Sequence, residues 1–404
     1  MRMEDPLRFR ALLIVLMLAV AAPCAAQAGA SNPSDSASVP PAPVVVAPPT
    51  PPDFPRGRIS GYMFGDLYYN VVGDPNHIYD ASGADQGKAT IDNATKPITR
   101  DLNGTQLRRV YFQLDNDLSI RYATRLRLEI DSKSLTSDGK LGANVKAAYL
   151  QAKSVIPRGD FFIGMMSTPT WENAEEFWQY RSIEKTIGDF RGIGSAADIG
   201  IELKGFMDGD HHFGYAAMIG NGLGQKPETD RYKKFYLTLP MRFGDLRIEP
   251  YLDYENVHLN LRDAVAPIDS VPGNYDRATY KLFAGYEFRR VAVGAEGLVR
   301  VNHWPAGPNR EPAGISVFAR GTATPTVAGF ARFDCWTPDR QLANRVDSQL
   351  WIAGLDWQPF KDIHVMPNIE ATQYIRKGAP SSFPAHHDLQ ARLTFYYKFS
   401  RPQS

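Results

Sequence analysis

Basic side chains recur at alternate positions of several segments, where they could form a line of positive charge. Arg125 and Arg127 are separated by one residue, and Glu129 follows at the same spacing. In an extended strand such residues share one face and lie about 7 Å apart. Two like charges at that distance repel by about 2.4 kcal/mol at an effective dielectric of about 20, so a neighbouring acid or a bound anion would relieve them. The same alternation places further basic residues on polar faces: Arg109, Arg247, Arg300, Arg320, Arg332, Arg392 and Lys398.

These basic residues allow two interpretations. Rows of Arg and Lys can form the wall of an anion-conducting pore. Acidic residues of the same parity are about as frequent, however, so the two signs can instead form a salt-bridge network that stiffens a wet interior. The sequence favours neither interpretation over the other.

Other chemistry finds little support. The doublets His211-His212 and His386-His387 would point to opposite faces of a strand, so neither can hold a metal with both rings. The glycine-rich stretch 220–224 precedes no helix, which argues against a nucleotide site, and no G-x-S-x-G segment is present. We therefore predict no catalytic residues, no metal and no cofactor.

Charge and cysteine counts exclude further classes. The chain has 45 Lys and Arg against 44 Asp and Glu, which gives no basic domain for nucleic acid. Its two cysteines, Cys24 and Cys335, exclude a disulfide framework and a multi-cysteine zinc site.

The elements that position these charges alternate apolar and polar residues with a period of two. Between 389 and 399 one face is Leu, Ala, Leu, Phe, Tyr and Phe, and the other is polar. This pattern predicts strands with one apolar face. Roughly sixteen segments show it: 58–70, 106–117, 121–132, 144–153, 159–166, 197–206, 211–221, 231–242, 245–257, 276–289, 291–303, 313–322, 326–336, 347–358, 362–376 and 386–399.

The connections between these segments alternate between short and long. Strands of about ten residues, with short turns at one end and long loops at the other, are typical of outer-membrane barrels. A soluble β-sandwich also alternates apolar and polar residues, but gives no reason for this segregation of connections. We predict an all-β protein: a transmembrane, antiparallel β-barrel of about sixteen strands with an aqueous lumen. Aromatic residues near strand ends fit interfacial girdles: Tyr68, Tyr69, Phe161, Phe162, Trp351, Trp357, Phe360, Phe395, Tyr397 and Phe399.

The N-terminal stretch predicts an export signal. Three arginines precede the apolar run 11–22, which is too short to span a bilayer, and Ala26-Gln27-Ala28 is a cleavage pattern. We predict a signal peptide at 1–28, a Pro- and Ala-rich periplasmic linker at 29–57 and a barrel domain at 58–404. The prolines of the linker favour an extended spacer.

The connection 167–196 interrupts the alternation. Thr170 has the chemistry of an N-cap, acids follow it, and Arg181 and Lys185 come later, which predicts a helix. Its apolar side chains need cover, so we expect this loop, after the fifth strand, to fold into the lumen rather than to pack on the rim. The residues expected to line the resulting constriction are Glu172, Glu175, Glu176, Tyr180, Arg181 and Lys185.

Several stretches resemble the phosphate-selective porin O and P family of outer-membrane channels, over residues of about 58 to 399. The resemblance implies a sixteen-stranded, usually trimeric channel whose phosphate-specific members carry an arginine ladder and a lysine cluster. Here acids match the basic residues, which departs from that pattern. The stretches that carry the resemblance are 109–112, 126–129, 168–170, 175–178, 180–186, 219–222 and 232–236.

The sequence thus predicts an outer-membrane porin for small hydrophilic solutes, possible anions such as phosphate among them. Its expected partners are outer-membrane lipid, these solutes and two further copies of itself, with no nucleic acid. An outer-membrane barrel enzyme, such as a hydrolase, and a structural or adhesive barrel are the alternatives. An enzyme would have fewer strands, a filled lumen and a Ser/His pair on the apolar face.

Overall fold

The computed structural model describes residues 53–73, 100–229, 231–258, 274–303, 309–343, 345–378 and 387–402. The chain divides into two units, Met1–Pro52 and Asp53–Ser404. The predicted signal peptide at 1–28 and most of the predicted linker at 29–57 lie outside the described residues. All that follows concerns the second unit.

The second unit is an antiparallel barrel. Its seventeen strand segments form sixteen strands, because β8 and β9 are two halves of one strand that both pair with β10. Pro240 falls between the halves and lacks the N–H that an unbroken ladder needs. The strands are β1 (Arg56–Val72), β2 (Asn103–Asp117), β3 (Tyr122–Leu135), β4 (Leu141–Ile156), β5 (Gly159–Ser167), β6 (Ala197–Phe206), β7 (Gly214–Gly220), β8 (Lys234–Thr238), β9 (Met241–Phe243), β10 (Leu246–His258), β11 (Asn274–Phe288), β12 (Val291–His303), β13 (Ala313–Thr324), β14 (Val327–Thr337), β15 (Arg345–Phe360), β16 (Ile363–Lys377) and β17 (His387–Pro402).

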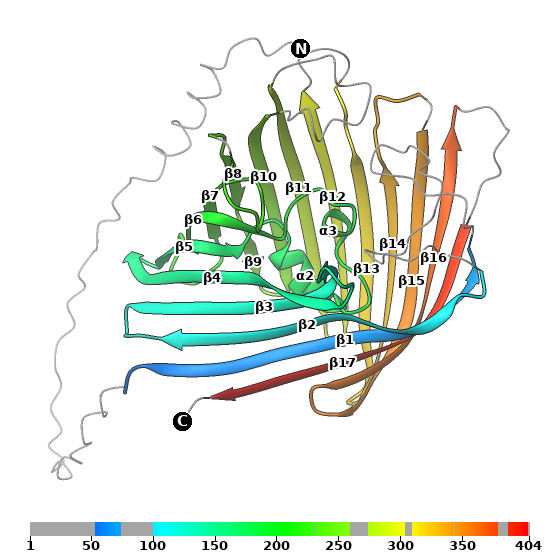
Figure 1. The fold of residues 1–404 in the computed structure, drawn as a ribbon, viewed down its shortest axis with the longest axis horizontal. Coiled ribbons are helices and arrows are strands. Elements are labelled where there is room, and N and C mark those ends of the chain that lie inside the picture. The colour runs from blue at the N-terminus through cyan, green and yellow to red at the C-terminus, as the bar shows by residue number, and fades with distance from the viewer. Residues whose placement is uncertain are drawn as a thin grey trace, which may run out of the picture. The chain divides into compact units, whose positions relative to one another are not determined.

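The barrel closes on itself. The first strand, β1, pairs with the next strand β2 on one side and with the last strand β17 on the other, both antiparallel. Figure 1 shows β1, in blue, beside β17, in red. A closed sheet has no free edge, so every strand gives its backbone hydrogen bonds to two neighbours.

The two faces of the wall differ as the alternation predicts. In β17 the side chain of Leu393 is 40% exposed on the outer face, whereas Arg392 and Thr394 are 4% and 0% exposed on the inner face. Large apolar side chains are exposed on the outer face of strands all around the barrel. Two of the aromatic residues predicted for the girdles point inward instead: Tyr68 is buried and Phe162 packs on Tyr149.

The connections also follow the prediction, with one correction. Two-residue turns such as 289–290, 325–326 and 361–362 join strands at one end, and longer connections such as 168–196 and 304–312 join them at the other. The connection predicted at 133–143 is shorter than expected, because β3 and β4 continue to Leu135 and Leu141. Within the described residues no helix is long and apolar enough to cross a membrane.

The connection after β5 carries two short helices, α2 (Glu172–Trp178) and α3 (Ile187–Phe190). Both contact strands of the far wall, α2 on β11 to β13 and α3 on β13, and Figure 1 shows them within the ring of strands. The predicted inward fold of this loop is therefore confirmed. The predicted N-cap is wrong: Trp171 occupies that position, and the hydroxyl of Thr170 instead hydrogen-bonds Tyr251 on the wall at 2.9 Å. The helix also ends at Trp178, before Arg181 and Lys185, because Gln179 has a left-handed backbone with φ of 65°.

Candidate pore wall and constriction loop

An apolar cluster attaches the loop 168–196 to the inner wall. Phe177 of α2 packs on Phe283 and Phe318, with ring centroids 5.5 and 6.2 Å apart, and Trp178 lies 5.2 Å from Phe318. Phe177 and Trp178 are 1% and 0% exposed. The close approach of Phe177 depends on Gly285 and Gly294, since a Cβ at Gly285 would lie 2.7 Å from its ring. Apolar residues on an otherwise polar inner wall thus mark where the loop packs.

Hydrogen bonds from the wall to loop carbonyls add a second set of anchors. Arg320 donates to the Phe177 carbonyl at 3.1 Å, and Arg332 donates to the Lys185 carbonyl. The Trp178 indole donates to the Glu184 carbonyl within the loop at 3.0 Å. These bonds occupy carbonyl groups at the C-terminal end of α2 and beyond it, which have no partner within the helix, so the loop is held by its backbone as well as by its side chains.

Arg108 holds the opposite side of the loop and was not among the predicted residues. It donates to the carbonyls of Ser182 and Ile183 at 3.2 and 2.7 Å. Simple alternation places it outside, next to the inward Arg109. A β-bulge, where Phe64 pairs with Arg109 but Gly65 pairs with Leu107, lets both arginines reach the lumen. The only sequence signal was the adjacent Arg108-Arg109 pair.

Three of the six predicted constriction residues form ion pairs within the loop, and a fourth, Tyr180, attaches the loop to the wall. Arg181 lies 2.9 Å from Glu175 and 3.3 Å from Asp189, and Lys185 lies 3.9 Å from Asp189. Tyr180 stacks on Phe330 and donates to Asp356 at 3.3 Å. Their contacts fix the fold of the loop.

The surroundings of this loop shift two pKa values. Loss of water around the Glu175 carboxyl raises its pKa, although the nearby Arg181 opposes this shift. Burial raises the pKa of Tyr180, and the adjacent Asp356 carboxylate raises it further. Tyr180 therefore stays neutral and acts as a hydrogen-bond donor.

Glu172 and Glu176 are the predicted constriction residues that face open space. Their side chains are 44% and 72% exposed, and each faces a cation on the wall. Lys204 on β6 lies 2.5 Å from Glu172, and Arg247 on β10 lies 3.4 Å from Glu176. Solvent-exposed acids on the loop therefore face one exposed base, Lys204, and one partly exposed base, Arg247, on strands.

Three of the eight predicted wall arginines are buried in ion pairs. Arg109 lies 2.8 Å from Glu129 and 3.6 Å from Asp131, and Lys146 completes this group at 3.1 Å from Glu129. Arg332 pairs with Asp334 at 2.5 Å. Arg392 pairs with Glu370 and donates to Asn368 at 3.0 Å. For these residues the salt-bridge interpretation holds.

Three further predicted arginines form no buried ion pair with a described residue: two are partly exposed in ion pairs, and one is buried against a hydroxyl. Arg320 is 21% exposed and pairs with Glu287 at 2.6 Å. Arg300 is buried and donates to the Thr279 hydroxyl at 3.1 Å. Arg125 is 32% exposed and pairs with Asp115 at 2.6 Å.

Arg127 differs from the other arginines. It donates to the Gln113 side chain at 2.6 Å and lies over the Tyr111 ring at 5.4 Å. Among the described residues no carboxylate pairs with it. Its charge is thus less compensated than that of Arg125. Lys398 is exposed on the inner parity of β17, at the end with the short turns.

One histidine doublet lies beside acids in a short turn. Asp208, Asp210 and His212 place one ligand atom each within 4.8 Å of one another. His211 points away and stacks on Phe206 at 4.1 Å, so only one ring of the doublet joins the group. Exposed acidic turns of this kind are common without a metal.

Comparisons with known proteins establish the fold of the chain but no family. No family model and no curated protein matches the chain. An anion-selective porin from Comamonas acidovorans is 13% identical, with 86% of this chain and 100% of that chain covered and a TM-score of 0.59. The outer-membrane channel DcaP of Acinetobacter baumannii is 13% identical over 85% and 97% of the two chains, with a TM-score of 0.59. OmpT of Vibrio cholerae, an outer-membrane protein in a trimer form, is 12% identical over 86% and 100%, with a TM-score of 0.55. The chain therefore shares its closed, sixteen-stranded barrel fold with solved outer-membrane porins and channels.

Proposed function

We propose that this protein is an outer-membrane porin, a water-filled channel for passive diffusion of small hydrophilic solutes. The observation that carries the proposal is the pair of opposed charges at the loop. Glu172 and Glu176 face Lys204 and Arg247, and Glu172, Glu176 and Lys204 are solvent-exposed while Arg247 is 24% exposed. Charged side chains that stay wet inside a closed barrel require water in the lumen. An apolar outer face all around the barrel requires lipid outside it.

The mixed charges support weak selectivity among ions. Most wall arginines are neutralised by a carboxylate within 3 Å, and the exposed charges at the loop are paired across the opening. At 0.15 M salt the Debye length is about 8 Å, so paired charges cancel beyond their immediate neighbourhood. We infer a general channel with a slight preference for anions near Arg127, phosphate included, and no dedicated phosphate ladder.

The wider assignment follows from the same proposal. Export through the predicted signal peptide at 1–28 would deliver the chain to the outer membrane, with 29–57 as a periplasmic linker. A homotrimer is consistent with the trimer form of the similar OmpT structure. The alternatives are a barrel hydrolase and a structural or adhesive barrel; sixteen strands and a wet inner wall favour the channel over either.

Chemical modification of a single loop position tests the proposal. In a background with Cys24→Ser and Cys335→Ser, Glu176→Cys places one thiol at the exposed edge of α2 inside the barrel. We expect single-channel conductance in planar bilayers to fall after addition of a bulky, water-soluble thiol reagent, because the adduct occupies the opening.

The control variant is Asp138→Cys, in the exposed turn 136–140, where an adduct lies outside the lumen. Its conductance should stay unchanged. No conductance from folded, membrane-inserted protein would contradict the channel, and an equal effect at both positions would contradict the place of α2 in the solute path.

A further inference from the structure

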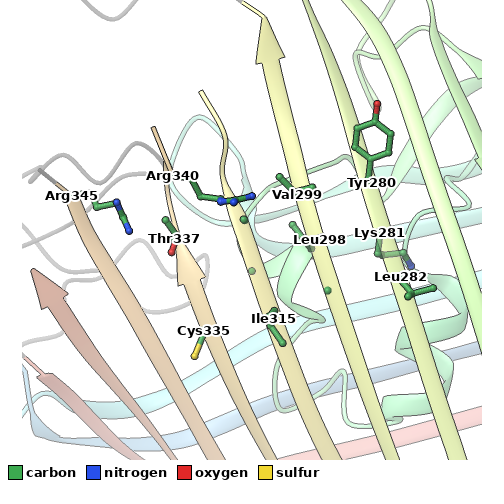
Figure 2. Close-up of a pocket in the computed structure, with 13 residues that line it drawn as sticks. Tyr280, Lys281, Leu282, Leu298, Val299, Ile315, Cys335, Thr337, Arg340 and Arg345 are labelled. Carbon is green, nitrogen blue, oxygen red and sulfur yellow. The ribbon is translucent and has the colours of Figure 1, made fainter. Parts of the chain in front are cut away.

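A depression lies on the outer face of β11 to β14, near the ends that lead into the long connections. Its volume is about 680 Å³. Figure 2 shows Tyr280, Leu282, Val299, Ile315 and Cys335 along it, with Arg340 and Arg345 at one end. We refer to this depression as the outer groove.

Strand register explains why the wall is hollow here. One outward row runs Tyr280, Val299, Ala313, Thr337 across four paired strands, and the next runs Leu282, Gly297, Ile315, Cys335. Directly paired side chains lie about 5 Å apart, so each residue sets the local height of the surface. Gly297 and Ala313 are small, and Tyr280, Leu282 and Ile315 beside them are 48%, 55% and 60% exposed. The result is an apolar floor between taller side chains.

Basic residues form the rim. Arg340 follows β14 and is exposed, and its side chain makes no ion pair within the described part of the chain. Arg345 begins β15 and pairs directly across the sheet with Lys377, a second cation, which is unfavourable without a counter-charge. Asp347 offsets only part of this charge, at 2.9 Å from Arg345. The rim therefore presents three basic side chains, Arg340, Arg345 and Lys377, beside an apolar floor.

We propose that the outer groove binds one membrane lipid with a phosphorylated headgroup, in the leaflet beside the long connections. The acyl chain lies along the floor at Gly297 and Ala313, beside Ile315, and the phosphate meets Arg340 and Arg345. Guanidinium groups bind phosphate with two parallel hydrogen bonds, which suits a headgroup at this rim. A second copy of the barrel would bring a mainly apolar outer wall and leave the rim without a counter-charge. The proposal rests on the proposed membrane location.

Lipid binding to the purified full-length protein in a neutral detergent tests this site directly. The probe is lipid A, titrated and counted by native mass spectrometry, with dephosphorylated lipid A and inorganic phosphate as separate arms. We expect lipid A to bind at least about tenfold more tightly than its dephosphorylated form, since loss of charge-assisted bonds of this strength costs a factor of ten or more. Alkylation of Cys335 in a Cys24→Ser background should slow when lipid A is bound.

Two variants and two matched controls locate the site. Arg340→Gln with Arg345→Gln should abolish the preference for the phosphorylated lipid, whereas Arg289→Gln with Arg290→Gln, at the short-turn end, should not. Gly297→Leu should fill the groove and reduce binding about tenfold, because a Cβ there meets no atom within 4 Å and the variant can fold. The control Gly329→Leu adds the same side chain to the outer face elsewhere, with ordinary contacts at 3.8 Å.

Each other outcome overturns the proposal. Equal binding of lipid A and its dephosphorylated form would show that the basic rim does not recognise the phosphate. Protection of Cys335 by inorganic phosphate alone would identify a free-anion site, and protection that rises with protein concentration would identify a second copy. Conductance is measured on the same samples: channels that conduct without lipid preference contradict only this proposal, and protein that neither inserts nor conducts contradicts the proposed function.

Discussion

At the scale of the residue, the inner wall carries two kinds of positive charge. Some arginines are buried in ion pairs and stabilise the barrel, whereas Arg127 pairs with no carboxylate among the residues that the structure describes. Arg392 is buried against Glu370, and Arg332 is buried against Asp334. Removing one partner of such a pair leaves an uncompensated buried charge, which costs about 3–5 kcal/mol, so these arginines are poor sites for tuning selectivity. Arg127 has an amide and a ring as neighbours instead. Its positive charge therefore extends into the lumen.

Replacement of Arg127 by Gln should shift ion selectivity toward cations. The variant removes one uncompensated positive charge and keeps a side chain that can hydrogen-bond Gln113. We expect the reversal potential in a salt gradient to move toward the cation value, by an amount that shrinks as salt rises and screening increases.

Matched variants of Arg127 and its neighbour separate charge from shape. Arg127→Lys should keep the wild-type reversal potential. Arg125→Gln with Asp115→Asn removes a pair that lies 2.6 Å apart and leaves the net charge unchanged, so it should shift the potential little. A larger shift from this neutral double variant than from Arg127→Gln would refute the role assigned to Arg127.

Residue orientation was predictable wherever the period of two continues without interruption. The inner-wall positions of Arg109, Arg125 and Arg392 followed from parity alone. Arg108 did not, because a single extra residue in β2 inverts the parity at that point. The ion-pair partners could not be predicted from the sequence either, because the contact of Arg125 with Asp115 depends on the register of two strands.

At the scale of the element, the loop 168–196 shows what composition can and cannot predict. The cluster of large apolar residues between two alternating strands required cover, and this requirement placed the loop inside the barrel. The predicted helix boundaries were wrong, because tertiary contacts and local backbone conformation determine where α2 begins and ends. Thr170 bonds Tyr251 rather than capping α2, and the left-handed Gln179 ends α2 before the expected basic residues. Local propensity is a weak guide where the wall supplies so many partners.

Replacing residues 172–187 by a short Gly-Ser linker should raise single-channel conductance. The linker joins Trp171 to Gly188, and these residues lie together, since a Cβ at Gly188 would be 2.2 Å from the Trp171 ring. A short linker can therefore connect them without strain. Removal of α2 leaves Phe283, Phe318 and Phe330 exposed to the lumen, which lowers stability, but strand pairing still closes the barrel. Planar-bilayer recordings measure the effect.

The control for loop replacement is the same linker in place of residues 137–139, in an exposed turn whose residues hydrogen-bond one another. Conductance of that variant should equal the wild-type value. If the loop variant folds, as judged by its β-sheet circular dichroism, and still conducts as the wild type does, the loop lies beside the solute path instead of across it.

At the scale of the whole molecule, closure and surface polarity together determine the environment of the barrel. Pairing of β1 with β17 leaves no strand edge, so the backbone needs no hydrogen bonds from solvent. The outer face bears exposed residues such as Phe360 at 70% and Leu355 at 56%, which water would not favour. The inner face holds charged side chains, many of them in ion pairs. This inversion of a soluble β-protein could be predicted from the sequence, since period, parity and connection lengths all agreed.

Unheated protein in mild detergent should therefore run on a gel as a compact species that shifts on boiling. Sixteen strands, each bonded to two neighbours, must separate together, because opening one pair exposes unpaired backbone groups to detergent tails. If three barrels associate, the unheated species has about the mass of a trimer by multi-angle light scattering. A band that does not shift on boiling contradicts the closed barrel, whereas a monomer mass with a normal shift contradicts only the trimer. The double variant Arg340→Gln with Arg345→Gln should keep both the shift and the mass, since the outer groove binds lipid and not a second copy.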